Sequence, residues 1–229
     1  MTRSLLPPRL LAERILAVLP QTQCTRCGYP DCAAYAQAIA ADGAAINQCP
    51  PGGLEGIQRL SAVTGRPVIA LNPENGLESP RRIAVIDENW CIGCTLCLPA
   101  CPTDAILGSH KMMHTVIEPH CTGCELCLPV CPVDCITLEN VTGSATGWAA
   151  WSPQQADAAR SRYDLKSYRR ISDEGYRHTN QVKLSTQALG DLPAPSRRED
   201  PALLEKKRSV VEAALARAKF KANQQPPPS

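Results

Sequence analysis

The segment CIGCTLCLPACPTDAILG at residues 91–108 returns thirty positions later as CTGCELCLPVCPVDCITL at residues 121–138. Eleven of the 18 aligned positions are identical, and both copies have the spacing C-x₂-C-x₂-C-x₃-C followed by proline. Aromatic residues make up only 4% of the chain. We therefore expect metal sites, rather than large aromatic side chains, to supply much of the folding energy of the cysteine-rich half.

The repeated spacing is the ligand run of bacterial two-cluster ferredoxins, in which the fourth cysteine of each run binds the other cluster. Gly93 and Gly123 allow the backbone to turn close to a cluster, and Pro102 and Pro132 direct the chain away after the fourth cysteine. Zinc modules usually combine C-x₂-C pairs with longer spacers, so zinc is disfavoured here. One predicted [4Fe–4S] site consists of Cys91, Cys94, Cys97 and Cys131, and the other of Cys101, Cys121, Cys124 and Cys127.

The second repeat contains a fifth cysteine, Cys135, which aligns with Ala105 of the first repeat. A buried cysteine behaves as a small apolar residue, so Cys135 is expected to pack rather than to bind iron. A spare ligand or a redox-active thiol is the alternative. His114 is another possible ligand near the second repeat. It is disfavoured because eight cysteines already complete both clusters.

A third group of cysteines lies nearer the N-terminus, and ProProGlyGly follows its last member. Its spacing, C-x₂-C-x₄-C-x₁₆-C, predicts a closed four-cysteine site that zinc or a [4Fe–4S] cluster could occupy. Two clusters elsewhere in the chain favour iron–sulfur here, for a total of three [4Fe–4S] clusters. The predicted ligands of this site are Cys24, Cys27, Cys32 and Cys49.

The cellular compartment decides between metal binding and disulfides for 13 cysteines. Arg9, Glu13 and Arg14 interrupt the apolar residues near the N-terminus, so no signal peptide is predicted. No apolar run approaches the roughly 18 residues of a membrane helix. A cytoplasmic protein with reduced, metal-binding cysteines is therefore expected.

Four stretches of the chain resemble a known family: QTQCTRCGYPDCAAYAQAI, INQCPPGG, AVIDENWCIGCTLCLPACPTDAI and MHTVIEPHCTGCELCLPVCPVDCITL. They are similar to the B subunit of the Rnf (or Rsx) electron-transport complex, over roughly residues 10 to 140. The resemblance implies an iron–sulfur subunit at the cytoplasmic side of a membrane complex that moves electrons between NADH and ferredoxin-level carriers, coupled to ion translocation. The family's cluster ligands fall on the twelve cysteines already named. Two departures from the family pattern are expected. Family members usually begin with a hydrophobic membrane anchor, and we expect none before the first helix here; the segment after Gly147 matches nothing in the family core.

The fold class expected from these patterns is α+β, with a two-cluster ferredoxin-like domain preceded by a small four-cysteine iron–sulfur domain and followed by a mainly helical or disordered tail. Helices are predicted at 9–19, 31–41, 153–166 and 201–221, and short strands flank the ligand loops of both repeats. The predicted domains are residues 1–60, a linker at 61–82, the ferredoxin domain at 83–140 and a basic tail at 141–229.

Charge is unevenly distributed along the chain. Residues 1–150 contain 9 Lys and Arg against 13 Asp and Glu, whereas residues 151–229 contain 15 against 9. We expect the basic tail to screen the acidic cluster-bearing part or to select an acidic redox partner.

No nucleotide-binding loop and no catalytic constellation occurs in the sequence. We therefore expect a carrier of single electrons without a substrate site of its own. Its expected partners are redox proteins, such as other Rnf/Rsx subunits or a ferredoxin, that hold it at the inner face of the cell membrane. The alternative is an iron–sulfur sensor of redox state or oxygen whose basic tail contacts nucleic acid or a partner. A third possibility is an assembly subunit with structural zinc at the N-terminal site.

Overall fold

The computed structural model describes residues 7–190 and separate positions between 202 and 220. The chain divides into two units, Met1–Lys166 and Ser167–Ser229. All 13 cysteines precede residue 136, so every candidate metal site lies in the first unit.

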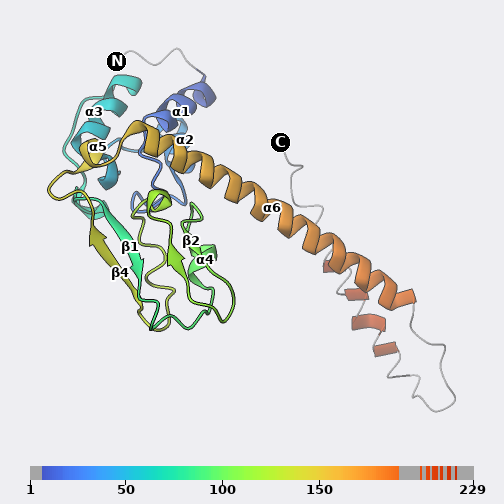
Figure 1. Ribbon diagram of the computed structural model, residues 1–229. Coiled ribbons are helices and arrows are strands. Elements are labelled where there is room, and N and C mark those ends of the chain that lie inside the picture. Colours follow the sequence, from blue (N-terminus) through green and yellow to red (C-terminus); the bar gives the residue numbers. More distant parts are fainter. Residues whose placement is uncertain are drawn as a thin grey trace. The chain divides into compact units, whose positions relative to one another are not determined.

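A helical module forms the N-terminal part of the first unit (Figure 1). The carboxylate of Asp31 accepts a hydrogen bond from the Ala34 N–H at 2.7 Å and so begins the second helix, as an N-cap residue does. Ile15 and Tyr35 are fully buried in the core of this module, together with Ile57. The module consists of α1 (Pro8–Ala17), α2 (Cys32–Gln37), a π-helical turn (Ala38–Asp42), a 3₁₀ turn (Pro50–Gly52) and α3 (Gly53–Thr64).

Both helices predicted in this module are confirmed, with changed ends. The helix predicted at 9–19 is α1, which ends at Ala17. Its residue Ile15 and the following Leu19 pack against the rest of the module. The helix predicted at 31–41 is α-helical only as far as Gln37, after which the turn widens to a π-helix. The start of the predicted linker is also helical, because α3 continues to Thr64.

The ferredoxin-like part pairs strands from both repeats. The first strand, β1 (Arg82–Ile86), lies antiparallel to the last, β4 (Ile136–Asn140), with Ala84 opposite Leu138. The inner strands β2 (Ile106–Leu107) and β3 (Thr115–Val116) pair in the same way. A one-turn helix, α4 (Cys97–Ala100), follows the first ligand loop. Each two-stranded sheet therefore takes one strand from each repeat, so the halves are related by an approximate two-fold arrangement (Figure 1).

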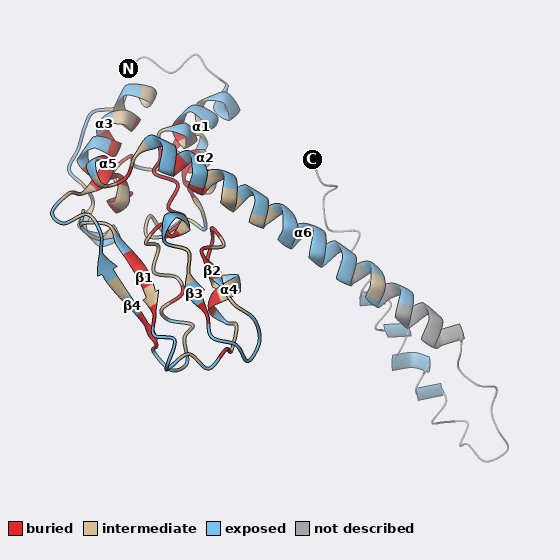
Figure 2. Cartoon of the chain, viewed as in Figure 1, coloured by how far each residue is buried: buried red, intermediate tan, exposed pale blue. Residues whose placement is uncertain are grey.

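Residues 141–166 belong to the first compact unit, whereas the sequence assigned them to the tail. The helix α5 (Gly147–Ala150) packs against α3, close to buried parts of the N-terminal module (Figure 2). Trp148 and Trp151 are 9% and 5% exposed. The Trp151 indole N–H donates to the Pro20 carbonyl oxygen at 2.9 Å. This contact joins residues 131 positions apart, so the local sequence pattern could not show it.

Replacing Trp151 by phenylalanine should lower the stability of the first unit by about 1–3 kcal/mol, because the buried Pro20 carbonyl would lose its hydrogen-bond donor. The Arg81 guanidinium, whose Cζ lies 4.7 Å from the Trp151 ring centroid, would keep an aromatic partner. Chemical denaturation of the variant and the unmodified protein measures the difference. An unchanged denaturation midpoint would show that the bond to Pro20 contributes nothing to stability.

The helix α6 (Pro153–Gly190) begins in the first unit and continues into the second. It confirms the helix predicted at 153–166 and extends it to Gly190, although residues 167–177 show mostly exposed or half-buried side chains and no continuous apolar face. The described positions between 202 and 220 are helical, as the prediction for 201–221 requires. The sequence also predicts a proline-rich linker at residues 190–201, which, apart from Gly190, lies outside the described residues, as does the C-terminal NQQPPPS.

Candidate metal centres

The twelve predicted ligands line three separate cavities in the first unit, with four predicted ligands to each cavity. None of the 13 cysteines forms a disulfide. The first cavity has a volume of 290 Å³ and is lined by Cys24, Cys27, Cys32 and Cys49. The second has a volume of 280 Å³ and is lined by Cys91, Cys94, Cys97 and Cys131. The third has a volume of 340 Å³ and is lined by Cys101, Cys121, Cys124 and Cys127.

The structure brings the fourth cysteine of each repeat to the other repeat's loop. Cys131 faces the cavity of the first-repeat loop, and Cys101 faces the cavity of the second-repeat loop. The loop conformation is also repeated: Gly93 and Gly123 have φ values of +66° and +69°, and Thr95 and Glu125 have φ values of +65° and +66°. The two loops therefore follow the same path and exchange one cysteine each.

The first cavity is built by a loop and the helix that follows it. Gln23, which is 3% exposed, accepts a hydrogen bond from the Cys32 N–H at 2.9 Å through its side-chain oxygen. The Tyr35 hydroxyl donates to the Ala45 carbonyl oxygen at 2.7 Å and accepts from the Gln48 N–H at 3.1 Å. These bonds hold the chain before Cys49 against α2, so the last cysteine of the group reaches the first three.

Sulfur atoms in the second cavity contact two side chains that are not predicted ligands. His114, 1% exposed, places its Nδ1 atom 3.5 Å from the Cys97 sulfur and 3.6 Å from the Cys91 sulfur. Its backbone N–H donates to the Cys91 sulfur at 3.4 Å. Cys135 is buried and its sulfur lies 3.5 Å from the Cys131 sulfur. Cys135 is thus buried, as a packing residue would be, and it also contacts a predicted ligand directly.

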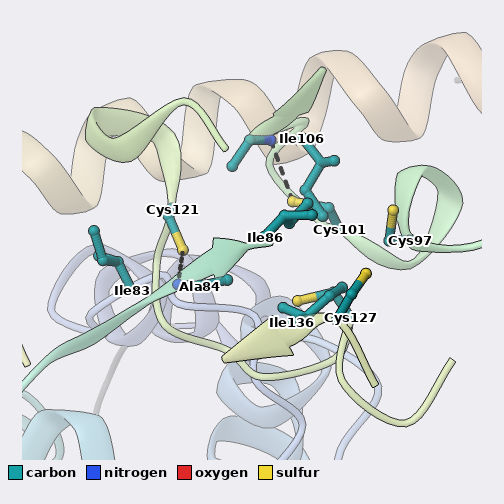
Figure 3. Close-up of a cluster of buried hydrophobic side chains, with 11 residues drawn as sticks. Ile83, Ala84, Ile86, Cys97, Cys101, Ile106, Cys121, Cys127 and Ile136 are labelled. Carbon is teal, nitrogen blue, oxygen red and sulfur yellow. Dashed lines mark hydrogen bonds between the residues drawn. The ribbon is translucent and has the colours of Figure 1, made fainter. Parts of the chain in front are cut away.

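The third cavity has backbone donors in the equivalent places. The Ala84 N–H donates to the Cys121 sulfur at 3.4 Å, as drawn in Figure 3, and the Ala105 N–H donates to the Cys101 sulfur at 3.2 Å. Two positively charged side chains donate hydrogen bonds to the backbone carbonyl oxygens of the same cysteines. The Arg81 guanidinium donates to the Cys121 carbonyl oxygen at 2.5 Å, and the Lys166 ammonium donates to the Cys101 carbonyl oxygen.

The electrostatics of the first and third cavities fit an iron–sulfur cube. Burial raises the pKa of the Cys32, Cys124 and Cys127 thiols to about 12, and neighbouring cysteines add to the effect. Burial also raises the pKa of Cys49 well above its ordinary value. Four thiolates in one poorly solvated cavity are unfavourable unless a cationic core compensates their charge, and iron provides it.

The sulfur atoms surround a volume rather than converge on a point. Among the residues that the structure describes, no three His, Cys, Asp or Glu side chains are grouped closely enough to hold a single metal ion. In a [4Fe–4S] cube each thiolate binds a different iron, so the ligands stand around the cube. The donor set and its arrangement in the three cavities suit such a group.

The first and third cavities are joined by contacts between the two cysteine-bearing parts. Thr22 lines the first cavity and Thr122 lines the third, and the Thr122 hydroxyl donates to the Thr22 carbonyl oxygen at 2.9 Å. Beside this bond Glu125 forms ion pairs with Arg26 at 2.9 Å and with Arg82 at 2.8 Å. A chain of hydrogen-bonded and charged groups thus holds these cavities against each other.

Comparison with known proteins identifies the cysteine-bearing parts. Residues 84–138 match a family described as "4Fe-4S dicluster domain", and residues 19–51 match one described as "Putative Fe-S cluster". The B subunit of the ion-translocating oxidoreductase complex of Azoarcus sp. (strain BH72) is 60% identical over 138 residues, which are 60% of this chain and 75% of that protein. The chain belongs to the family of B subunits of ion-translocating oxidoreductase complexes.

Other members of this B-subunit family are similarly close. The protein of Alkalilimnicola ehrlichii is 52% identical over 152 residues, 66% of this chain and 81% of the relative. The protein of Thiobacillus denitrificans is 55% identical over 107 residues, 47% of this chain and 57% of the relative. The resemblance to the Rnf/Rsx B subunit and the expected ferredoxin-like fold with a preceding iron–sulfur domain are confirmed.

No solved structure matches the chain. In the part of the chain that the structure describes, none of the helices combines the length and the apolar character that crossing a membrane requires.

Proposed function

We propose that this chain carries single electrons through three [4Fe–4S] clusters as a subunit of an Rnf-type electron-transport complex. Each cluster, when bound, supplies a one-electron redox centre. The observation that carries the proposal is the sorting of twelve cysteines into three cavities of four, together with the membership of the B-subunit family. The proposed ligands are the twelve cysteines that line these cavities.

The protein's own residues would determine the order of the relay. Cys101 and Cys131 cross between the second and third cavities, and the Thr122–Thr22 hydrogen bond connects the third cavity to the first. The proposed path therefore runs between the first and second cavities by way of the third. The ion pairs of Glu125 with Arg26 and Arg82 keep this spacing constant, which favours rapid transfer between neighbouring sites.

Partners are proposed for both ends of this path. Relatives are named as subunits of an ion-translocating oxidoreductase complex, so other subunits of such a complex are the proposed donors and acceptors. We also propose that these subunits hold the chain at the inner face of the cell membrane. The basic part of the chain after residue 150 would contribute to recognition of an acidic partner.

An anaerobic redox titration followed by electron paramagnetic resonance tests the proposal. Protein purified without exposure to air should contain about twelve iron and about twelve sulfide per chain, four of each per cluster. Three reversible low-potential signals are expected. About eight iron with one zinc would instead make the first cavity a structural zinc site. The absence of any reversible four-iron signal would refute electron transfer by this chain.

A further inference from the structure

The two halves of the ferredoxin-like part differ in the side chains that face the cysteine sulfurs. The repeat offset of thirty aligns Ala84 with His114 and Ala105 with Cys135. The backbone bears out the first alignment, because the Ala84 N–H donates to the Cys121 sulfur and the His114 N–H donates to the Cys91 sulfur, each at 3.4 Å. The third cavity thus has alanine at both positions, where the second has an imidazole and a thiol.

The fold leaves space for the imidazole beside the second cavity. A Cβ atom on Gly108 would lie 1.8 Å from the His114 Cδ2 atom, so the ring occupies the room that a side chain at 108 would need. The position that aligns with Gly108 in the other repeat is Leu138, which lies opposite Ala84 in the β1–β4 sheet. In the first pair the later residue, His114, is large and Gly108 is small, whereas in the second pair Leu138 is large and Ala84 is small. Each half thus combines a large and a small residue at these two aligned positions, with the sizes exchanged. The placement of His114 is therefore a specific feature of the second cavity.

The imidazole can act only as a donor toward these sulfurs. A cysteine that binds iron does so as a thiolate and has no proton to give. The His114 Nδ1 atom lies within 3.6 Å of two such sulfurs, so the ring proton belongs on Nδ1. The Nε2 atom is buried without a hydrogen-bond partner, and a proton placed there would leave both ring nitrogens unsatisfied.

The thiol of Cys135 also acts as a hydrogen-bond donor toward a ligand sulfur. Its sulfur lies 3.5 Å from the sulfur of Cys131, which lines the second cavity, and Cys135 lines that cavity as well. With Cys131 as a thiolate, Cys135 supplies the proton of this contact. Hydrogen bonds to ligand sulfur stabilise the more negative, reduced cluster and so raise its reduction potential.

We propose that His114 and Cys135 are positioning residues that raise the reduction potential of the cluster held in the second cavity. The proposal rests on the proposed function, since it requires clusters in the second and third cavities. It does not say which of the two clusters has the higher reduction potential. Arg81 and Lys166 place positive charge on the backbone of the third cavity's ligands, and this charge also affects the potential of the cluster there. Removing both donors should lower the reduced-to-oxidised ratio of this cluster at a fixed potential by about tenfold. For a one-electron couple, this corresponds to a midpoint potential lower by about 59 mV.

The test is the same anaerobic titration on the full chain with substituted residues. His114→Leu fills much of the ring's volume without a donor, and Cys135→Ala removes the thiol. Each should lower the same midpoint and leave the other midpoints unchanged. His114→Gln, which retains an N–H donor, should restore part of the loss. The mirror variant Ala105→Cys adds a thiol beside Cys101 and should raise a different midpoint, that of the cluster in the third cavity.

The outcomes separate this proposal from the function on which it rests. Unchanged midpoints in His114→Leu and Cys135→Ala, with all clusters retained, would overturn the role of the two donors and leave electron transfer intact. If His114→Leu fails to bind its cluster, Cys135→Ala and Ala105→Cys still decide, because opposite shifts of two different midpoints are expected. The lack of any reversible four-iron signal in the unmodified protein would refute the proposed function itself.

Discussion

Replacing Cys101 by alanine should empty the third cavity, which belongs to the other repeat's loop, and spare the cluster beside its own loop. Cys101 shares the third cavity with Cys121, Cys124 and Cys127, and its sulfur is held there by the Ala105 N–H at 3.2 Å. Without this sulfur one iron corner of the cube has no protein ligand. Iron and sulfide per chain should fall by about a third, as expected for the loss of one of three four-iron clusters.

The identity of the lost cluster can be read by comparison with two reference variants. Cys124→Ala removes a ligand of the third cavity, and Cys94→Ala removes a ligand of the second. The magnetic resonance spectrum of the Cys101 variant should match that of the Cys124 variant. A match with the Cys94 variant would mean that each repeat holds its own cluster, and the exchange of cysteines between repeats would be wrong.

Replacing Gly123 by alanine should destabilise the second ligand loop more than the same change at a glycine with open space around it. Gly123 has φ of +69°, and its added Cβ would lie 2.4 Å from the Arg82 carbonyl oxygen. Arg82 cannot move away easily, because β1 is paired along its length with β4. The left-handed conformation and the overlap together should cost about 3 kcal/mol, and the melting temperature of the cluster-loaded protein should fall by roughly 6–12 °C.

Gly143 provides the matched control for this substitution. Its φ is +59°, and a Cβ atom there would have nothing within 4 Å. Gly143→Ala therefore carries the conformational cost alone, about 1 kcal/mol. Equal changes in melting temperature for the two variants would show that the contact with the Arg82 carbonyl is relieved without cost. A larger loss for Gly123→Ala, accompanied by faster loss of iron to a chelator, is the expected result.

The cysteine spacing predicted the fold class and the family because ligand geometry is a local requirement. A cube reached by three cysteines within seven residues permits few loop conformations, so the two copies at residues 91–108 and 121–138 specify the same path. The short strands beside the loops and the helices at Pro8–Ala17 and Cys32–Gln37 follow from equally local patterns. That each predicted group of four cysteines lines one cavity agrees with the spacing, and iron binding by these residues stays a prediction.

Features that depend on distant contacts were not predictable in this way. The compact unit extends to Lys166 because Trp148 and Trp151 are buried against the N-terminal module, and nothing in residues 141–166 indicates that partner. The contacts of His114 with the sulfurs of Cys91 and Cys97 join positions 23 and 17 residues apart. They also need the room that Gly108 leaves for the imidazole ring. The only signal available in the sequence was the alignment of residue 84 with residue 114, which places a histidine where the other copy has alanine.

The crossing of Cys101 and Cys131 has a consequence for biosynthesis. Neither ferredoxin-like cavity can be assembled from one repeat, because each takes its fourth cysteine from the other. While the chain is being translated, the second cavity lacks a wall until residue 131 has left the ribosome, and β1 must wait for β4 at residues 136–140 to form its sheet. Under the proposed function, cluster insertion by the cell's iron–sulfur machinery follows synthesis of the whole repeat pair, whereas all four cysteines of the first cavity are present once residue 49 has emerged.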